Sequence, residues 1–155
     1  MVPTLLDEFH AALFRDVRPH AGRHRRNDYG SDSLTFGPNI SLPKELVEIE
    51  LEEVFGELRK GVDSFEAHPD DPGYEESALR LAAWVHAKLI GIHPYEDGNG
   101  RTCRALMNCV LVRLGLHAVR IEAPKQEYLT CLNYYYRTND LKPLEDLLLR
   151  LYDVP

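Results

Sequence analysis

The sequence predicts an all-α domain with one short β-hairpin. Apolar residues recur with helical spacing in six segments, and one further segment alternates around a Gly-Pro-Asn turn. A nearly continuous apolar run also follows a glycine-rich turn. Because a helix that is apolar on all sides belongs in the interior of a domain, we expect about six helices around one buried central helix.

Length and composition fit one ordinary globular domain. The chain has 155 residues, of which 44% are hydrophobic. Its formal net charge of -7 argues against general nucleic-acid binding. No apolar run reaches the length of a membrane span, and the first ten residues lack a signal-peptide pattern. We therefore expect neither a nucleic-acid nor a membrane partner, and a cytoplasmic protein.

The cysteines support a reducing compartment. They are odd in number, match no zinc-binding spacing and lie in apolar helical patterns: Cys103, Cys109 and Cys131. Buried free thiols of this kind are typical of cytoplasmic proteins.

The N-terminal third predicts a helix, a basic loop and a hairpin. The first helix is expected over residues 4–15, with Thr4 as a possible N-cap. Residues 15–26 form the one basic cluster of an acidic chain. Residues 29–42 alternate around the turn and predict the β-hairpin.

Two long helices should follow the hairpin. The first is expected over residues 43–60 and should end at Gly61. Its glutamates predict a solvated face and not a metal site: Glu48, Glu50, Glu52, Glu53 and Glu57. The second should begin at residue 72 or 74 and end at residue 90, next to Gly91. On it, His86 is expected to be a packed histidine.

The central helix is expected over residues 101–114, closed by Gly115. Arg101 and Arg104 are three residues apart, so we expect both in one pocket at the helix start. The last helices are expected over residues 124–138 and 143–152, the first with three residues facing inward: Tyr128, Leu132 and Tyr135.

Residues 93–104 gather the chemically active side chains. They read His-Pro-Tyr-Glu-Asp-Gly-Asn-Gly-Arg-Thr-Cys-Arg. A glycine-rich turn that opens a helix offers backbone N–H groups and a positive dipole end to an anion, and arginines suit phosphate oxygens. His93 can accept a proton, and Asp97 can hold Mg²⁺ beside a phosphate. Each part alone would be an ordinary turn or solvated helix end. Two cations at a positive helix end, however, indicate a bound anion.

This stretch resembles the signature of the Fic family, His-x-Phe-x-Asp/Glu-Gly-Asn-Gly-Arg-x-x-Arg. Seven positions match: His93, Asp97, Gly98, Asn99, Gly100, Arg101 and Arg104. Tyr95 replaces the usual Phe, so its hydroxyl needs water or a partner. The resemblance extends over about residues 8–151 and implies a single Fic domain over residues 1–155, with residues 29–42 as the flap.

The resemblance implies transfer of AMP from ATP to a Ser, Thr or Tyr hydroxyl of a target protein. His93 would be the general base, and Asp97 would hold Mg²⁺ or Mn²⁺. The phosphates would be bound by Gly98, Gly100, the Asn99 amide, Arg101 on the β-phosphate and Arg104 on the γ-phosphate. The flap residues Leu34, Thr35 and Phe36 would hold the target by strand pairing. Glu96 is given no role.

Alternatives remain open at this point. The fold could serve a kinase, another nucleotidyl or phosphocholine transferase, or an enzyme that removes AMP. Gly100 argues against the kinase branch of the family, which has lysine there. A non-catalytic interaction module is a further class, although every catalytic position is intact.

Fic proteins often restrain themselves with a Ser/Thr-x-x-x-Glu-Gly/Asn helix. Here Glu8 and Glu45 complete only the first part of that pattern, because Phe9 and Leu46 follow them. We therefore expect no self-inhibition. Any restraint would come from a separate small antitoxin-like partner or from a segment outside residues 1–155, and the chain could also act as an effector delivered into another cell.

Overall fold

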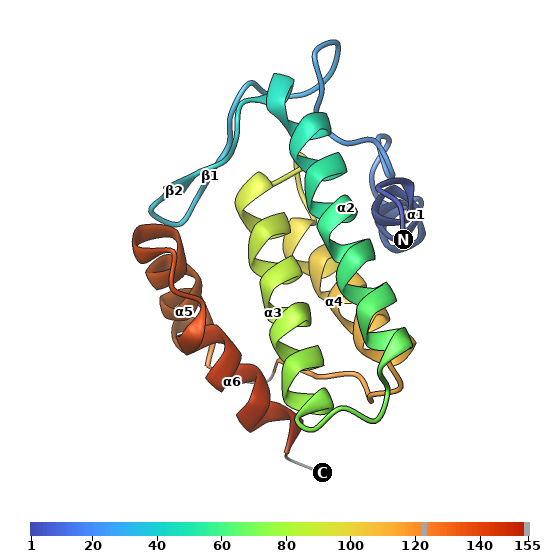
Figure 1. Ribbon diagram of the computed structural model, residues 1–155. Coiled ribbons are helices and arrows are strands. Elements are labelled where there is room, and N and C mark those ends of the chain that lie inside the picture. The colour runs from blue at the N-terminus through green and yellow to red at the C-terminus, as the bar shows by residue number, and fades with distance from the viewer. Residues whose placement is uncertain (122–123, 154–155) are drawn as a thin grey trace.

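Helices α3 (Tyr74–Ile92) and α4 (Asn99–Arg113) lie against each other at the centre of the fold. The structure, a computed structural model, describes residues 1–121 and 124–153. Its other elements are α1 (Thr4–Phe14), β1 (Thr35–Phe36), β2 (Asn39–Ile40), α2 (Lys44–Ala67), α5 (Lys125–Thr138) and α6 (Lys142–Tyr152). Helix α2 covers one side of the central pair, α5 and α6 cover the other, and α1 lies beside α4 (Figure 1). This arrangement confirms the predicted all-α class with one short hairpin.

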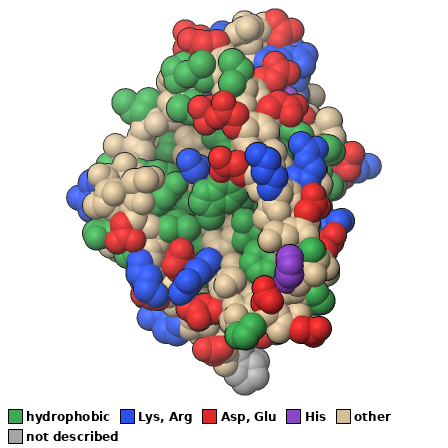
Figure 2. Space-filling model, in the orientation of Figure 1, with side chains coloured by type: hydrophobic (Ala, Val, Ile, Leu, Met, Phe, Trp, Pro, Cys, Tyr) green, Lys and Arg blue, Asp and Glu red, His purple; other side chains and the backbone are tan. Residues whose placement is uncertain are grey.

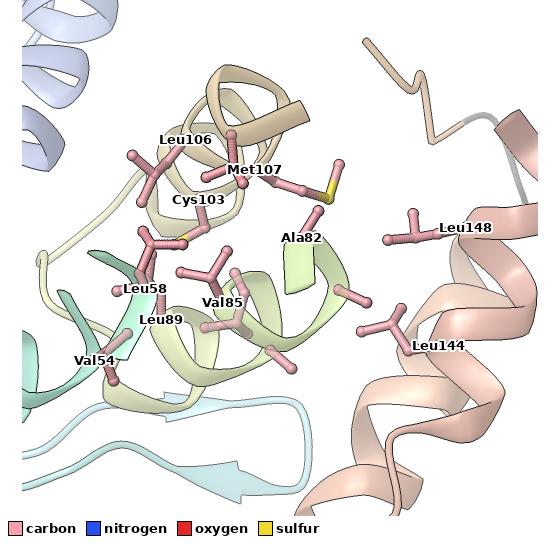
Figure 3. Packing of buried hydrophobic residues seen from close by; sticks show 14 of the residues in the cluster. Val54, Leu58, Ala82, Val85, Leu89, Cys103, Leu106, Met107, Leu144 and Leu148 are labelled. Atoms are coloured by element: carbon pink, nitrogen blue, oxygen red, sulfur yellow. The ribbon is translucent and has the colours of Figure 1, made fainter. Parts of the chain in front are cut away.

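The core forms where α2, α3 and α4 meet (Figure 3). Leu58 of α2, Leu89 of α3 and Leu106 of α4 are fully buried there, and Cys103 lies among them. On the other side of α3, Leu144 and Leu148 of α6 add a second contact. Helix α4 is thus the buried central helix that its apolar sequence predicts. The inward-facing residues predicted on α5 are also buried: Tyr128, Leu132 and Tyr135.

The predicted end of α2 at Gly61 is wrong, because the helix continues to Ala67. A Cβ atom on Gly61 would lie 3.1 Å from both Cδ atoms of Leu81, so the glycine provides room for a close approach of α3. Val62 extends the buried stripe beyond it. Burial of this stripe outweighs the low helix propensity of glycine, which is about 1 kcal/mol.

A similar error places the end of α3 two residues too early. Gly91 lies inside the helix, where a Cβ would approach the Tyr136 ring to 3.1 Å, and α3 ends at Ile92. Helix α4 begins at Asn99, two residues before the predicted start, and Gly115 follows it with φ 80°. Thr4 is not an N-cap, because Pro3 occupies that position without a side-chain cap.

The hairpin is shorter than the alternating segment predicts. Its strands pair Thr35 with Ile40 and Phe36 with Asn39. The turn between them contains Gly37, whose φ of 58° a glycine adopts readily. The hairpin reaches from the start of α2 towards the end of α5 (Figure 1). The rest of residues 29–42 is irregular and forms no further strand.

The acidic side of α2 is a solvated surface. Acidic side chains are spread over the face of the molecule in Figure 2 instead of gathering at one place. Of the five glutamates predicted to form this face, four are exposed and one is half-buried: Glu48, Glu52, Glu53 and Glu57, with Glu50. Within residues 1–121 and 124–153, no group of three or more His, Cys, Asp and Glu residues is arranged to hold a metal ion. The same part of the chain contains no helix that is both long and apolar enough to cross a membrane.

Buried His86 makes the stability of the fold depend on pH. Its Nε2 lies 2.7 Å from the Tyr128 hydroxyl, and burial lowers the pKa of His86 to about 4. In the unfolded chain a histidine protonates near pH 6.5. Between pH 6.5 and 4 the unfolded chain therefore binds the proton and the folded protein does not. The stability that neutral His86 contributes is complete above pH 6.5 and is lost as the pH falls to 4.

We expect the free energy of unfolding to fall between pH 7 and pH 4 by about 3 kcal/mol more in the parent than in His86→Gln. Urea unfolding at a series of pH values measures this difference. His68→Gln, at an exposed histidine, is the matched control and should behave as the parent does. Equal pH dependence in the parent and His86→Gln would contradict the assignment.

Candidate active site

The turn between α3 and α4 is held closed by Asn99. The Asn99 side chain accepts a hydrogen bond from the Tyr95 N–H at 2.8 Å and donates one to the Tyr95 carbonyl at 2.7 Å. Asn99 is also 2% exposed. Both ends of its amide are therefore engaged with the turn itself. This differs from the sequence interpretation, in which the amide contacts a phosphate.

The start of α4 has backbone N–H groups that no side chain caps. The N–H groups of the first helical residues, Asn99, Gly100 and Arg101, have no intrahelical acceptor in an α-helix. Gly98 at the N-cap has φ 82° and no side chain that could cap them. The positive end of the helix dipole adds to these donors.

His93 is oriented as a proton acceptor. Its Nδ1 lies 3.4 Å from the Ile90 carbonyl. Because a carbonyl only accepts, Nδ1 carries the hydrogen and Nε2 keeps a free lone pair. The Phe36 ring of the flap stacks on the imidazole at 4.5 Å with an interplanar angle of 10°. Burial, with a smaller contribution from the Arg25 charge, lowers the pKa of His93, so its neutral form persists to lower pH.

His93 and Gly100, at the start of α4, line a cavity of about 370 Å³. Arg104 lines it as well, together with Phe36 and Asn39 of the hairpin and a wall from α5: Lys125, Tyr128, Leu129, Leu132, Asn133 and Tyr136. The sequence placed Arg101 in the same pocket. It is not among the lining residues, because its guanidinium lies 4.4 Å above the Phe14 ring of α1.

Asp97 lies beside the helix start. Its side chain is 51% exposed and pairs with Arg18 at 2.5 Å, and its Oδ1 accepts a hydrogen bond from the Gly98 N–H at 2.6 Å. These two donors hold the pKa of Asp97 below its usual range. His10 of α1 hydrogen-bonds the Asp97 carbonyl at 3.0 Å and so supports the turn from the side of α1.

The two residues that precede Asp97 fasten the turn to its surroundings. Tyr95 is 1% exposed and donates its hydroxyl proton to Asp7 at 2.6 Å, so the hydroxyl finds the partner that the sequence requires. Glu96, which the sequence left without a role, accepts hydrogen bonds from the N–H and hydroxyl of Ser31. It thereby connects the motif to the beginning of the flap segment.

The flap residues lie beside the proposed base. Leu34 and Phe36 are half-buried, and Thr35 is exposed. The tip of the hairpin is bound to α5 by a hydrogen bond from the Asn39 amide to Asn133 at 2.7 Å. Since β1 pairs only with β2, its other edge carries no strand among the described residues.

Sequence reasoning missed three residues of this site: His10, Arg18 and Arg25. Arg18 and Arg25 were visible only as members of a basic cluster. His10 had no signal beyond its place in a helix. The residues at the end of α3 and in the turn that they contact lie 67 to 87 residues away along the chain, so no local pattern could have revealed these contacts.

A family model described as the Fic/DOC family matches residues 3–111. The protein adenylyltransferase Fic of Nematostella vectensis is 32% identical over 142 residues, which are 88% of this chain and 29% of that protein. The chain thus spans less than a third of the length of this curated relative.

Solved structures show the same architecture. BepC of Bartonella tribocorum, determined with bound AMPPNP, has a TM-score of 0.78 at 20% identity over 97% of this chain and 73% of its own. Fic-1 of C. elegans has a TM-score of 0.70 at 26% identity over 98% of this chain and 40% of its own. Fold and site together define an all-α domain in which hairpin residues and the start of a buried central helix line the same cavity. The chain belongs to the Fic/DOC family, and the predicted Fic fold is confirmed.

Proposed function

We propose that this domain transfers AMP from ATP to a hydroxyl group of a target protein and releases pyrophosphate. The observation that carries the proposal is the shared cavity, which His93, Gly100 and Arg104 all line. A proton acceptor, an anion-binding helix start and a guanidinium are the groups that such a transfer requires. The adenylyltransferase name of the Nematostella relative and the AMPPNP bound to BepC support the same reaction.

In this reaction the target hydroxyl oxygen attacks the α-phosphorus. His93 takes the hydroxyl proton at Nε2 while the bond from the α-phosphorus to the bridging oxygen breaks. Pyrophosphate leaves with the electron pair of that bond. The N–H groups of Asn99 and Gly100 neutralise the charge that develops on it, with Arg101 and Arg104 as further phosphate donors.

We assign the metal site to Asp97. A single half-exposed carboxylate beside a helix N-terminus fits Mg²⁺ or Mn²⁺, since Mg²⁺ usually takes one or two protein carboxylates together with phosphate oxygens and water. Bound there, the ion would supply positive charge to the phosphates.

AMP transfer is expected to require Mg²⁺ or Mn²⁺, and Asp97→Ala is expected to lose both activity and the response to metal. Label transfer from α-labelled ATP across a metal titration measures this. Asp28→Ala, which removes an exposed carboxylate of the basic loop, is the matched control and should keep the metal response. Full activity of the parent in excess chelator would refute the assignment.

The target segment is proposed to bind along the free edge of β1. Leu34, Thr35 and Phe36 would pair with it through main-chain hydrogen bonds, as in recognition by strand addition. This would bring a Ser, Thr or Tyr hydroxyl to His93, on which Phe36 is stacked. We propose a reducing cytoplasm as the compartment, in the producing cell or in a cell that receives the protein, because Cys103 and Cys131 are buried free thiols.

Labelled ATP separates the candidate reactions. Label from α-labelled ATP on a protein, identified by mass spectrometry of a lysate, means AMP transfer. Label from γ-labelled ATP alone means phosphorylation and would overturn the proposal. Binding of no nucleotide at all would identify an interaction module.

The domain is proposed to be free of internal inhibition. Among residues 1–121 and 124–153, no carboxylate forms an ion pair with Arg104. Glu8 and Glu45 are both exposed, and neither lines the cavity. A restraining partner, if one exists, would therefore have to bring its own carboxylate to Arg104.

We expect Glu8→Gly and Glu45→Gly to transfer AMP at the parent rate, because neither carboxylate competes with a phosphate for Arg104. Initial rates with α-labelled ATP measure this. A large gain in either variant would show that the inhibitor lies within this chain.

A further inference from the structure

Arg25 is a buried cation whose N–H groups bind mainly backbone carbonyls. It is 0% exposed. Within the described ranges 1–121 and 124–153, no carboxylate forms an ion pair with it. Burying a charge is costly unless hydrogen bonds replace the lost water. The acceptors of its N–H groups therefore explain why a charged side chain is retained at this buried position.

One side of the guanidinium binds the end of α3. Nε and Nη2 donate to the His93 carbonyl at 3.1 and 2.9 Å, and Nη2 also lies 3.2 Å from the Ile92 carbonyl. The Arg25 backbone N–H donates to the Pro94 carbonyl at 2.7 Å. These carbonyls lie at the negative end of the helix dipole, which favours a cation.

The other side of the guanidinium binds both ends of the flap segment. Nη1 donates to the carbonyls of Ser31 and Asp32, each at 3.1 Å, where the segment begins. Nη2 donates to the Leu42 carbonyl at 3.0 Å and lies 3.1 Å from the Ser41 hydroxyl, where the segment returns. One rigid planar group thus connects the flap to the backbone of the proposed base.

His93 needs such a support. It has φ 53° and ψ 61°, a left-handed conformation that residues other than glycine rarely adopt. Strained positions of this kind persist only where the surroundings hold them. Two donors of Arg25 hold the carbonyl of this residue.

We propose that Arg25 is a positioning residue that fixes His93 relative to the flap, so that a hydroxyl on a flap-bound target meets the base. The role rests on the proposed AMP transfer. Arg25 is not among the described residues that line the cavity, so we expect nucleotide binding not to depend on it. Misplacement of reacting groups by about 1 Å can cost roughly 100-fold in rate. Loss of the Arg25 guanidinium should therefore slow the transfer step.

Arg25→Lys tests this role. Lysine keeps the charge but presents its donors from a single atom, which cannot span the carbonyls of His93, Ser31 and Leu42 together. We expect kcat/KM for transfer to fall roughly 10-fold to 100-fold, while the Kd for a non-hydrolysable ATP analogue stays unchanged. Arg26→Lys makes the same chemical change at the next residue, whose side chain bonds exposed Asp28, and should transfer at the parent rate.

Amide hydrogen exchange separates positioning from general stability. The Leu34, Ser41 and Lys44 N–H groups bond the Ser41 hydroxyl, the Leu34 carbonyl and the Asp32 carbonyl. In Arg25→Lys these amides should exchange faster, whereas the core amides of α3 and α4 should keep the parent rate. Exchange that rises equally in the flap and in the core would overturn the proposal, as would transfer at the parent rate.

Ser41→Ala serves as the second variant in case Arg25→Lys does not fold. It removes one acceptor of the Arg25 guanidinium and leaves the backbone carbonyls in place. We therefore expect a smaller fall in kcat/KM for transfer, with unchanged nucleotide affinity. A parent protein that transfers no AMP would refute the proposed function, and the exchange experiment would still decide whether Arg25 connects the flap to His93.

Discussion

Replacing His93 with alanine is expected to reduce AMP transfer by ~10²–10⁴-fold, the usual loss on removal of a general base. Nucleotide affinity should stay close to that of the parent, because the helix start and Arg104 remain in place. Single-turnover transfer from α-labelled ATP measures the chemical step, and calorimetry with a non-hydrolysable analogue measures binding.

The matched control is His117→Ala, because this exposed histidine stacks on Tyr152 and lies outside the cavity. It should transfer AMP as the parent does. If His93→Ala retains the parent rate, another group accepts the proton. If it instead loses nucleotide affinity, His93 has a binding role that the present assignment omits.

Gly98→Ala is expected to damage both the fold and nucleotide binding. A Cβ at this position would lie 2.5 Å from Cε2 and 2.6 Å from Cζ of Phe14, and 3.3 Å from Nε2 of His10. The residue also has φ 82°, which alanine adopts only with strain. Together, overpacking and strain should cost about 2–5 kcal/mol of stability. The displaced helix start should no longer present its N–H groups to a phosphate.

Gly73→Ala separates the two causes. Gly73 also precedes a helix and has φ 75°, but a Cβ there would have nothing within 4 Å. It should cost about 1–2 kcal/mol from backbone strain alone and leave nucleotide binding intact. Thermal unfolding and calorimetry of both variants test this, and equal losses of stability would mean that contact with Phe14 does not matter.

Much of the fold was accessible from the sequence because its helices carry regular apolar stripes. The errors at the ends of α2 and α3 fall at glycines, where helix propensity and packing disagree. Gly61 and Gly91 were read as helix ends, but each lies where another side chain, Leu81 or Tyr136, approaches the helix closely. Such contacts join segments that are distant along the chain, and helical periodicity contains no information about them.

In the candidate site, too, the sequence predicts what depends on local patterns and misses contacts between distant segments. His93, Asp97 and Arg104 come from one continuous stretch, so a local motif was sufficient to find them. The residues that hold the stretch in place come from elsewhere: His10 from α1 and Arg25 from the basic loop. Their side chains act on backbone carbonyls, which are the same for every residue type. The sequence of the motif therefore gives no indication of its supports.

The strands of the hairpin are so short that its order depends on contacts outside it. Two residues on each side cannot form a stable hairpin alone, so its order depends on Arg25 at its base and on Asn133 and Tyr136 near its tip. The last two also line the cavity. A ligand in the cavity would therefore contact Asn133 and Tyr136, which support the hairpin. The free edge of β1 in this hairpin is the proposed binding place of the target. We therefore expect binding at the two places to be coupled, and reciprocity then requires each ligand to change the affinity for the other by the same factor.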